Sequence, residues 1–156
     1  MFLANGKSKL LAEKALLAYK DTIPLVILRP PIVYGPRDIG MYELFKSIHK
    51  GFLISIGKKP QFASCIYIDD LINILLSSIK GNKFGVYNLA SGKINSFSKI
   101  AKIVVFLSKS KSKIINTKRI GLMPHNGYRP FDINLIKNNF KNIELCSITN
   151  GIKKYL

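Results

Sequence analysis

The stretch LVILRPPIVYGPRD, residues 25–38, determines our prediction of the fold. It opens on a β-branched apolar run that does not alternate with polar residues. Such a run is typical of a strand that is covered on both faces, as in a parallel sheet. Two prolines end the run, and the Gly-Pro pair that follows marks a loop. We therefore expect a buried strand over 25–29 and a loop over 32–40.

The segment before this strand has the pattern of a helix over about 7–20. Asn5 or Ser8 can serve as its N-cap. A helix that leads into a buried strand is the αβ part of a crossover unit. The apolar side chains of this helix need a partner surface, and they recur at helical spacing as Leu10, Leu11, Ala15, Leu16 and Leu17.

The rest of the chain continues the alternation of strands and helices, which indicates the α/β class. Asp69 or Asp70 can cap one of the later helices and Asn95 or Ser96 another, because the first amides of a helix lack internal acceptors. The expected strands lie at 65–68, 86–90 and, as an edge strand, 113–117. The expected helices lie at about 40–50, 70–80, 96–108, 132–140 and 147–156.

The chain has 156 residues, which is enough for one domain with a substantial core. Its formal charge is +17, a value that by itself suggests binding to nucleic acid or to an anionic membrane surface. The lysines are scattered, however, and the densest run, SKSKSK at 108–113, has no interleaved aromatic residues to stack on bases. We therefore favour a compositional bias toward Ile, Asn and Lys as the source of the charge, and do not expect a nucleic-acid partner.

The cysteines and histidines form no metal-binding pattern. Cys65 and Cys146 lie far apart in apolar surroundings, so we expect buried free thiols, which fit a reducing compartment. There is no C-x-x-C pair, and His49 and His125 have no ligand at metal-site spacing. No stretch reaches the roughly 18 apolar residues of a spanning helix, and no signal peptide is visible. The expected location is the cytoplasm, without a membrane partner and without a metal.

A glycine-rich dinucleotide motif is also absent from the sequence. A dinucleotide-binding half places a glycine-rich turn at a helix N-terminus, so that backbone amides can approach the pyrophosphate. Neither G-x-G-x-x-G nor G-x-x-G-x-x-G occurs. The chain is therefore not expected to bind NAD in the usual way unaided.

Three segments resemble the NAD-dependent epimerase/dehydratase family, the extended short-chain dehydrogenases. They are VILRPPIVYGPRD at 26–38, FASCIYIDDL at 62–71 and GVYNLASG at 85–92, and they occur in the family's order. RPFDINLIKNNF at 129–140 and SITNGIKKYL at 147–156 resemble the family's last two helices. The resemblance implies the fold of an oxidoreductase or isomerase and a cofactor that is NAD or NADP.

The resemblance also implies how the chain is organised. Residues 1–156 correspond to the C-terminal part of a Rossmann-like NAD(P)-binding fold with a small substrate-binding subdomain, and the N-terminal βαβ half has no counterpart. Residues 1–60 and 84–92 would form the remainder of the Rossmann-like sheet. Residues 37–83 and 93–156 would contribute the substrate-binding part.

NGKSK at 5–9 resembles the family's catalytic Y-x-x-x-K segment, which places Lys9 on the lysine and Asn5 on the tyrosine. In the family the tyrosine is the general acid/base, and the lysine lowers its pKa and bonds the nicotinamide ribose. Asn5 cannot exchange a proton near neutral pH, so it could orient a substrate but not replace the phenol. Lys9 would then be a ribose contact, or a solvated charge paired with Glu13 at i+4.

Pro30, Pro31 and Ile32 match the family segment that passes the nicotinamide, and the alternative interpretation is a strand end stopped by proline. Many members that bind nucleotide sugars have Asn where Ile32 stands and Arg where Ala63 stands. These two departures argue against a nucleotide-sugar substrate.

The resemblance makes Tyr34, Arg37 and Arg129 candidate substrate-binding residues. A guanidinium suits a phosphate, and the alternative for both arginines is a surface role.

Three functions remain open at this level. The first is a truncated or split NAD(P)-dependent epimerase, dehydratase or reductase, whose substrate-binding half acts on a sugar nucleotide or a similar hydroxy or keto compound and is inactive alone. Its partners would be a small-molecule substrate, a separate N-terminal half and, by resemblance, a second copy in a homodimer. The others are a basic nucleic-acid-binding module and a degenerate remnant without activity.

Overall fold

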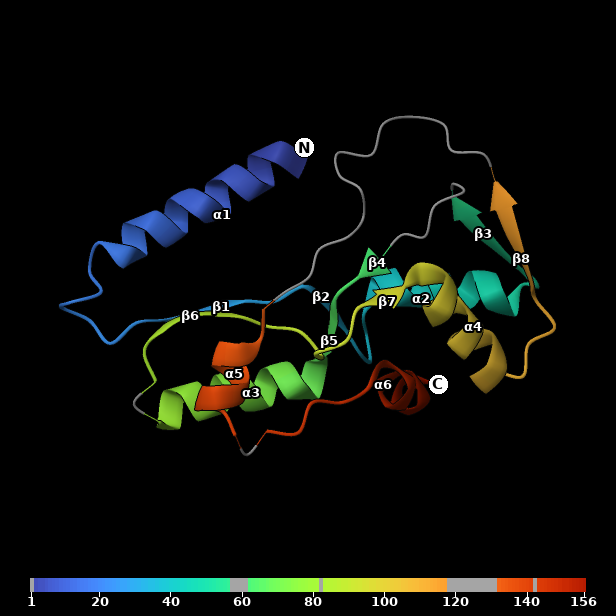
Figure 1. Cartoon of the computed structure of the whole chain (residues 1–156). Coiled ribbons are helices and arrows are strands. Elements are labelled where there is room, and N and C mark those ends of the chain that lie inside the picture. Colours follow the sequence, from blue (N-terminus) through green and yellow to red (C-terminus); the bar gives the residue numbers. More distant parts are fainter. Residues whose placement is uncertain (1, 57–61, 82, 118–131, 142) are drawn as a thin grey trace.

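The computed structural model describes residues 2–56, 62–81, 83–117, 132–141 and 143–156, and it has α/β architecture (Figure 1). The helices are α1 (Phe2–Leu17), α2 (Ile39–His49), α3 (Ile68–Lys80), α4 (Phe97–Leu107), α5 (Asn134–Asn139) and α6 (Ile148–Tyr155). The strands are β1 (Val26–Arg29), β2 (Ile32–Tyr34), β3 (Phe52–Ile56), β4 (Phe62–Ala63), β5 (Cys65–Tyr67), β6 (Gly85–Asn88), β7 (Asn95–Ser96) and β8 (Lys113–Thr117).

The central strands are parallel, which confirms the prediction made from the apolar run. β1 pairs with β6 in the register Val26↔Gly85, β2 pairs with β5, and β3 pairs with β8, all in parallel. The short strands β4 and β7 form an antiparallel pair. The predicted strand at 113–117 is confirmed as β8, and its partner β3 was not predicted.

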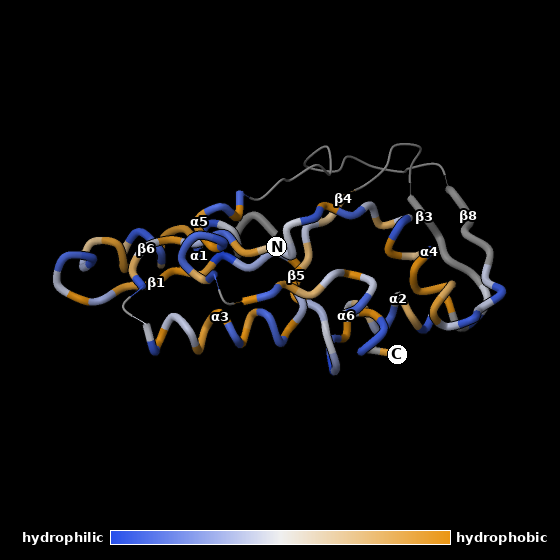
Figure 2. The backbone as a smooth tube through the Cα atoms, turned by 60° about the horizontal axis from the view of Figure 1, so that its bottom comes forward, coloured by the Kyte–Doolittle hydropathy of each residue, from blue (hydrophilic) through white to orange (hydrophobic). Residues whose placement is uncertain are grey.

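One face of the β1–β6 pair is covered by α3 and α5. The side chains of Val26 and Leu28 lie on this face and pack beside a buried cluster from α3, α5, β5 and β6. Within the cluster the ring of Tyr87 meets that of Phe140 edge-on, with 5.3 Å between their centroids. α3 alternates between hydrophobic and hydrophilic segments along its length (Figure 2), as an amphipathic helix on a sheet should.

A second buried cluster joins α2, α4 and α6 to strands β2 and β5. Its fully buried members include Tyr34, Ile48, Ile100 and Ile152. The hydroxyl of Ser96 accepts a hydrogen bond from the N–H of Lys99 at 3.2 Å, which confirms one of the two N-caps expected for α4.

Asp69 and Asp70 do not cap α3 as expected. The N-cap residue is Tyr67, which makes no side-chain cap hydrogen bond, so this prediction is wrong. The buried carboxylate of Asp70 instead accepts the backbone N–H of Cys146 at 2.8 Å. Burial raises the pKa of Asp70, and the Cys146 N–H partly opposes that shift. Asp70 therefore fixes the chain that leads into α6 rather than the start of its own helix.

We predict that Asp70→Ala lowers the free energy of unfolding by about 1–3 kcal/mol, because it leaves the Cys146 N–H without its acceptor. Asp70→Asn keeps an acceptor oxygen and removes the buried charge, so it should cost clearly less. Urea unfolding at pH 7 compares the two variants. Equal losses for alanine and asparagine would contradict the assignment of this hydrogen bond.

Two elements differ from the sequence prediction. α1 begins at Phe2, so Asn5 and Ser8 lie inside the helix rather than at its N-cap, and it ends at Leu17. Residues 32–34, expected in a loop, form β2 because they pair with β5.

Both cysteines are free thiols, as expected. Cys65 is buried, and burial raises the pKa of its thiol to about 11. Cys146 is half-buried rather than buried. The described residues contain no group of three or more metal-ligating side chains, and none of the described helices is long and apolar enough to cross a membrane.

Candidate functional site

An ion pair connects α1 to β1. Nε of Arg29 donates to Glu13 at 3.0 Å, and a second nitrogen of the same guanidinium bonds the other carboxylate oxygen. The hydrogen bond from Arg29 lowers the pKa of Glu13. Glu13 therefore pairs with Arg29 rather than with Lys9, which was the partner considered from sequence.

This ion pair sets the position of the predicted cofactor residues. α1 and β1 run in opposite directions (Figure 1). Lys9 lies one helical turn before Glu13, and Pro30 follows Arg29 directly, so Lys9 and the segment 30–32 lie at the same end of the pair. Asn5 precedes Lys9 by four residues, which places both on one face of the helix. The side chains of Lys9 and Ile32 are exposed at this end.

Arg37 lies in a tight turn directly after β2. The N–H of Asp38 donates to the carbonyl of Gly35 at 3.1 Å. Arg37 itself has φ +72°, a backbone conformation that residues other than glycine rarely adopt. The Asp38 carboxylate then caps α2 by accepting the N–H groups of Gly40 and Met41. The turn presents the Arg37 side chain to solvent.

Tyr34, predicted to bind substrate, is almost fully buried. Its side chain is 1% exposed and packs edge-on against Tyr67, with ring centroids 5.5 Å apart. The hydroxyl points at Gly151 of α6 and has no hydrogen-bond partner among the described residues. Burial is the main reason that the pKa of Tyr34 is raised. The last candidate, Arg129, lies outside the described residues.

The ion pair between Glu13 and Arg29 was not predicted from the sequence. It joins residues sixteen positions apart in two different elements, and local spacing gives no signal for such a contact.

The sequence model of an NAD-binding family described as "Male sterility protein" matches residues 5–75. UDP-glucuronic acid 4-epimerase from Bacillus cereus, solved with UDP-glucuronic acid and NAD, is 26% identical, and the match covers 96% of this chain and 50% of that one with a TM-score of 0.79. The chain is similar to NAD-dependent epimerases and dehydratases. Its fold is the partial Rossmann-like fold of these extended short-chain dehydrogenases.

Two solved structures with lower sequence identity share the fold. UDP-glucose 4-epimerase from Thermotoga maritima, solved with UDP-glucose, has 17% identity, a TM-score of 0.80 and coverage of 96% of this chain and 51% of that one. RMD from Pseudomonas aeruginosa, solved with NADPH, has 15% identity, a TM-score of 0.77 and coverage of 96% and 53%. The chain thus spans about half the length of these epimerase-type enzymes. A comparison with curated protein sequences gives no match.

The Bacillus cereus epimerase was solved with NAD and RMD with NADPH, and a dinucleotide in this chain would need matching groups among the described residues. A pyrophosphate needs free amides at a helix N-terminus. Here Asp38 caps α2, Ser96 caps α4 and Ser147 caps α6, while α3 has two carboxylates in its first turn. These described helix starts therefore do not fit the pyrophosphate. Among the described residues, the exposed side chains of Lys9 and Ile32 lie together at one end of the α1–β1 pair.

Proposed function

We propose that this chain is the substrate-binding half of an NAD(P)-dependent epimerase, dehydratase or reductase, and that it acts together with a half that carries the glycine-rich turn. The observation that carries the proposal is the match over 96% of this chain to half of an enzyme solved with both NAD and UDP-glucuronic acid. The substrate would be a sugar nucleotide or a similar hydroxy or keto compound.

The site residues take the following roles in this proposal. Lys9 contacts the ribose of the cofactor, and the segment 30–32 passes the nicotinamide. Arg37, exposed on its turn, binds an anionic group of the substrate, because a guanidinium can donate two parallel hydrogen bonds to a phosphate or carboxylate. Tyr34 acts through packing in the described structure, since its hydroxyl faces α6. Arg129 remains a second candidate for the anion.

Proton transfer is the step for which the residues of the proposed site are least suited. Asn5 stands where the related enzymes would use a phenol, and an amide neither donates nor accepts a proton near neutral pH. We therefore propose that the chain alone is catalytically inactive, and that even the assembled protein is slow while Asn5 is present.

We predict that the isolated chain does not bind NADH with micromolar affinity. The reason is that the starts of α2, α4 and α6 are capped by side chains, α3 has two carboxylates in its first turn, and the sequence has no glycine-rich turn. Isothermal titration calorimetry with NADH measures this directly. The full-length Bacillus cereus epimerase is the positive control, and micromolar binding by the isolated chain would contradict the proposal.

A further inference from the structure

The outer face of α4 combines an exposed aromatic ring with lysine side chains. Ile100, Ala101 and Val104 are buried on the inner face of this helix. On the outer face Lys102 and Phe106 are exposed, and their spacing of four residues makes them neighbours on the helix surface. The side chain of Phe106 is 81% exposed. Single exposed apolar side chains are common on proteins, so the groups around this ring decide what it can bind.

The turn that follows α4 adds two more exposed lysines, Lys109 and Lys111. The N–H of Lys109 donates to the carbonyl of Phe106 at 3.3 Å, and Lys109 has φ +51°. Glycine is the usual residue at this place after a helix, because a Cβ strains the left-handed backbone. The lysine therefore brings a positive charge within one helical turn of Phe106, although another residue would suit the backbone better.

Two hydroxyl groups join this turn to the end of α2. Oγ of Ser110 donates to the carbonyl of Ile48 at 3.1 Å, and Oγ of Ser112 donates to the same oxygen. The residue that follows α2 as its C-cap, Lys50, is exposed. The fold thus gathers lysines that are scattered along the sequence. We define the α4 surface as the side chains of Lys50, Lys102, Phe106, Lys109 and Lys111.

The lysines of the α4 surface have no acidic partner among the residues that the structure describes. α4 itself contains no acidic residue. The one acid of α2, Glu43, forms an ion pair with Lys46 at 3.7 Å. The whole chain has a formal charge of +17, so a second copy would be repelled. The α4 surface therefore suits a partner that is negatively charged and can receive one aromatic ring.

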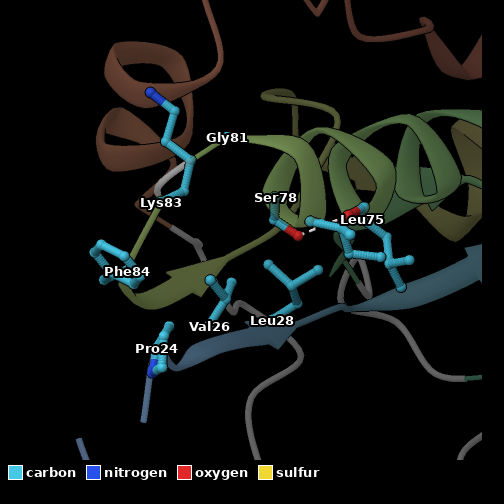
Figure 3. Close-up of a pocket in the computed structure, with 9 residues that line it drawn as sticks. Pro24, Val26, Leu28, Leu75, Ser78, Gly81, Lys83 and Phe84 are labelled. Carbon is cyan, nitrogen blue, oxygen red and sulfur yellow. Dashed lines mark hydrogen bonds between the residues drawn. The ribbon is translucent and has the colours of Figure 1, made fainter. Parts of the chain in front are cut away.

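The hollow beside α3 is exposed and apolar too, but it lacks this combination. Val26 and Leu28 of β1 face Leu75 of α3 across a hollow of about 610 Å³ (Figure 3). Among its described lining residues Lys83 is the one cation, and its ammonium group points away from the hollow (Figure 3). Charge complementarity with an anionic partner thus distinguishes the α4 surface from this hollow.

The shape of the α4 surface favours lipid headgroups over nucleic acid. Single-stranded nucleic acids stack successive bases on several aromatic rings along a groove. Phe97, which is also exposed, lies nine positions before Phe106 and so about half a turn around the helix, where the two rings cannot form one platform. A convex helix with one apolar side chain among lysines fits a bilayer, since the ring enters the headgroup region and the ammonium groups reach lipid phosphates.

We infer that the α4 surface binds reversibly to a membrane surface that contains anionic lipids. Phe106 enters the headgroup region, and the four lysines lie against the lipid phosphates. Such contact is peripheral and requires no spanning helix. It replaces our expectation that the chain has no membrane partner. The inference does not rest on the proposed function, because α2 and α4 lie at the opposite end of the structure from β1 and β6 (Figures 1 and 2).

The test measures co-sedimentation of the purified chain with two kinds of vesicle. One kind is phosphatidylcholine alone, and the other contains about 30% phosphatidylserine. A lysine near an anionic bilayer strengthens binding about fivefold, so four lysines should favour the anionic vesicles by at least about a hundredfold. Raising NaCl from about 0.1 M to about 1 M should remove most of this preference, because the Debye length falls from about 10 Å to about 3 Å.

Matched double variants separate the α4 surface from the net charge. Replacing Lys109 and Lys111 with glutamate should weaken binding to the anionic vesicles at least about 25-fold. The control replaces Lys137 and Lys141, which are exposed in and after α5, and changes the net charge equally. Figures 1 and 2 place α5 away from α4, so the control should weaken binding by no more than about twofold.

Single variants test the ring and the turn. Phe106→Ser should weaken binding at least about fivefold, while Leu135→Ser, at a 58% exposed residue of α5, should leave binding unchanged. Lys109→Gly should weaken binding about fivefold and raise the midpoint of thermal unfolding, since it relieves the left-handed backbone. This variant loses binding while it gains stability, so a damaged fold cannot explain its effect.

Four results would overturn the inference. The first is equal binding to the two kinds of vesicle, and the second is an equal loss of binding in the two double variants. The third is a Phe106→Ser variant that binds like the unmodified chain. The fourth is a single-stranded oligonucleotide that displaces the chain from vesicles and itself no longer binds when Lys109 and Lys111 are replaced, which would assign the α4 surface to nucleic acid.

Discussion

Replacing Asn5 with tyrosine in the protein assembled with a glycine-rich half should raise its NADH-dependent turnover by about 10²–10⁴-fold. The position lies in α1, four residues before Lys9, so a phenol there would share a helical face with the ammonium. A nearby positive charge lowers the pKa of a phenol, and this brings a proton-transfer group to a site that now has an amide. Turnover is measured with NADH and a panel of keto sugars and ketones.

Lys9→Ala in the tyrosine variant is the matched control. It removes the charge that lowers the pKa of the phenol, so most of the gain should disappear, and the pH at which the remaining activity rises should move upward. Full activity of the assembled protein with Asn5 unchanged would show that another group moves the proton. Equal inactivity of all three proteins would support the degenerate remnant instead.

Gly151→Ala should lower the free energy of unfolding by about 2 kcal/mol, although alanine normally stabilises a helix by about 1 kcal/mol over glycine. A Cβ at this position of α6 would overlap the hydroxyl oxygen of Tyr34 and lie 2.8 Å from its Cζ atom. The ring cannot move aside easily, because it is 1% exposed and packs against Tyr67. Urea unfolding measures the loss.

Two further variants identify the cause of this loss. Gly6→Ala in α1 makes the same substitution where, among the described residues beyond its own helical turn, no atom lies within 4 Å of the added Cβ, so it should be neutral or stabilising. Tyr34→Phe removes the overlapping oxygen, which has no hydrogen-bond partner among the described residues, and should restore much of the stability of Gly151→Ala. A double-mutant cycle without coupling between the two positions would contradict the contact.

The sequence predicted elements whose signals are local. The unbroken apolar run before Pro30 identified β1, and the hydroxyl of Ser96 at the start of an apolar period identified the cap of α4. Contacts between distant residues left no such signal. Asp70 looked like a helix cap because it stands at a helix start, yet its carboxylate binds the Cys146 N–H, 76 residues away.

In the candidate site, too, some features have a local sequence signal and others depend on contacts between distant residues. The resemblance to the family made Lys9, the segment 30–32 and Arg37 candidates, and these roles remain predictions. The motif could not show that the hydroxyl of Tyr34 faces Gly151 in α6, because this depends on how the C-terminal helix packs. It could not show the left-handed backbone of Arg37 either, since that follows from the turn between β2 and α2.

The parallel pairing of the strands has a consequence for how the chain folds. β1 ends at Arg29, and its partner β6 begins only at Gly85. β3 begins at Phe52, and its partner β8 begins only at Lys113. Such distant pairings must close long loops before they gain any stabilisation, so this topology folds slowly compared with helical proteins of the same size. During that delay the apolar β1 strand exposes both of its edges, and unpaired strand edges promote aggregation. Synthesis on the ribosome does not shorten this delay, because β1 emerges from the ribosome before β6.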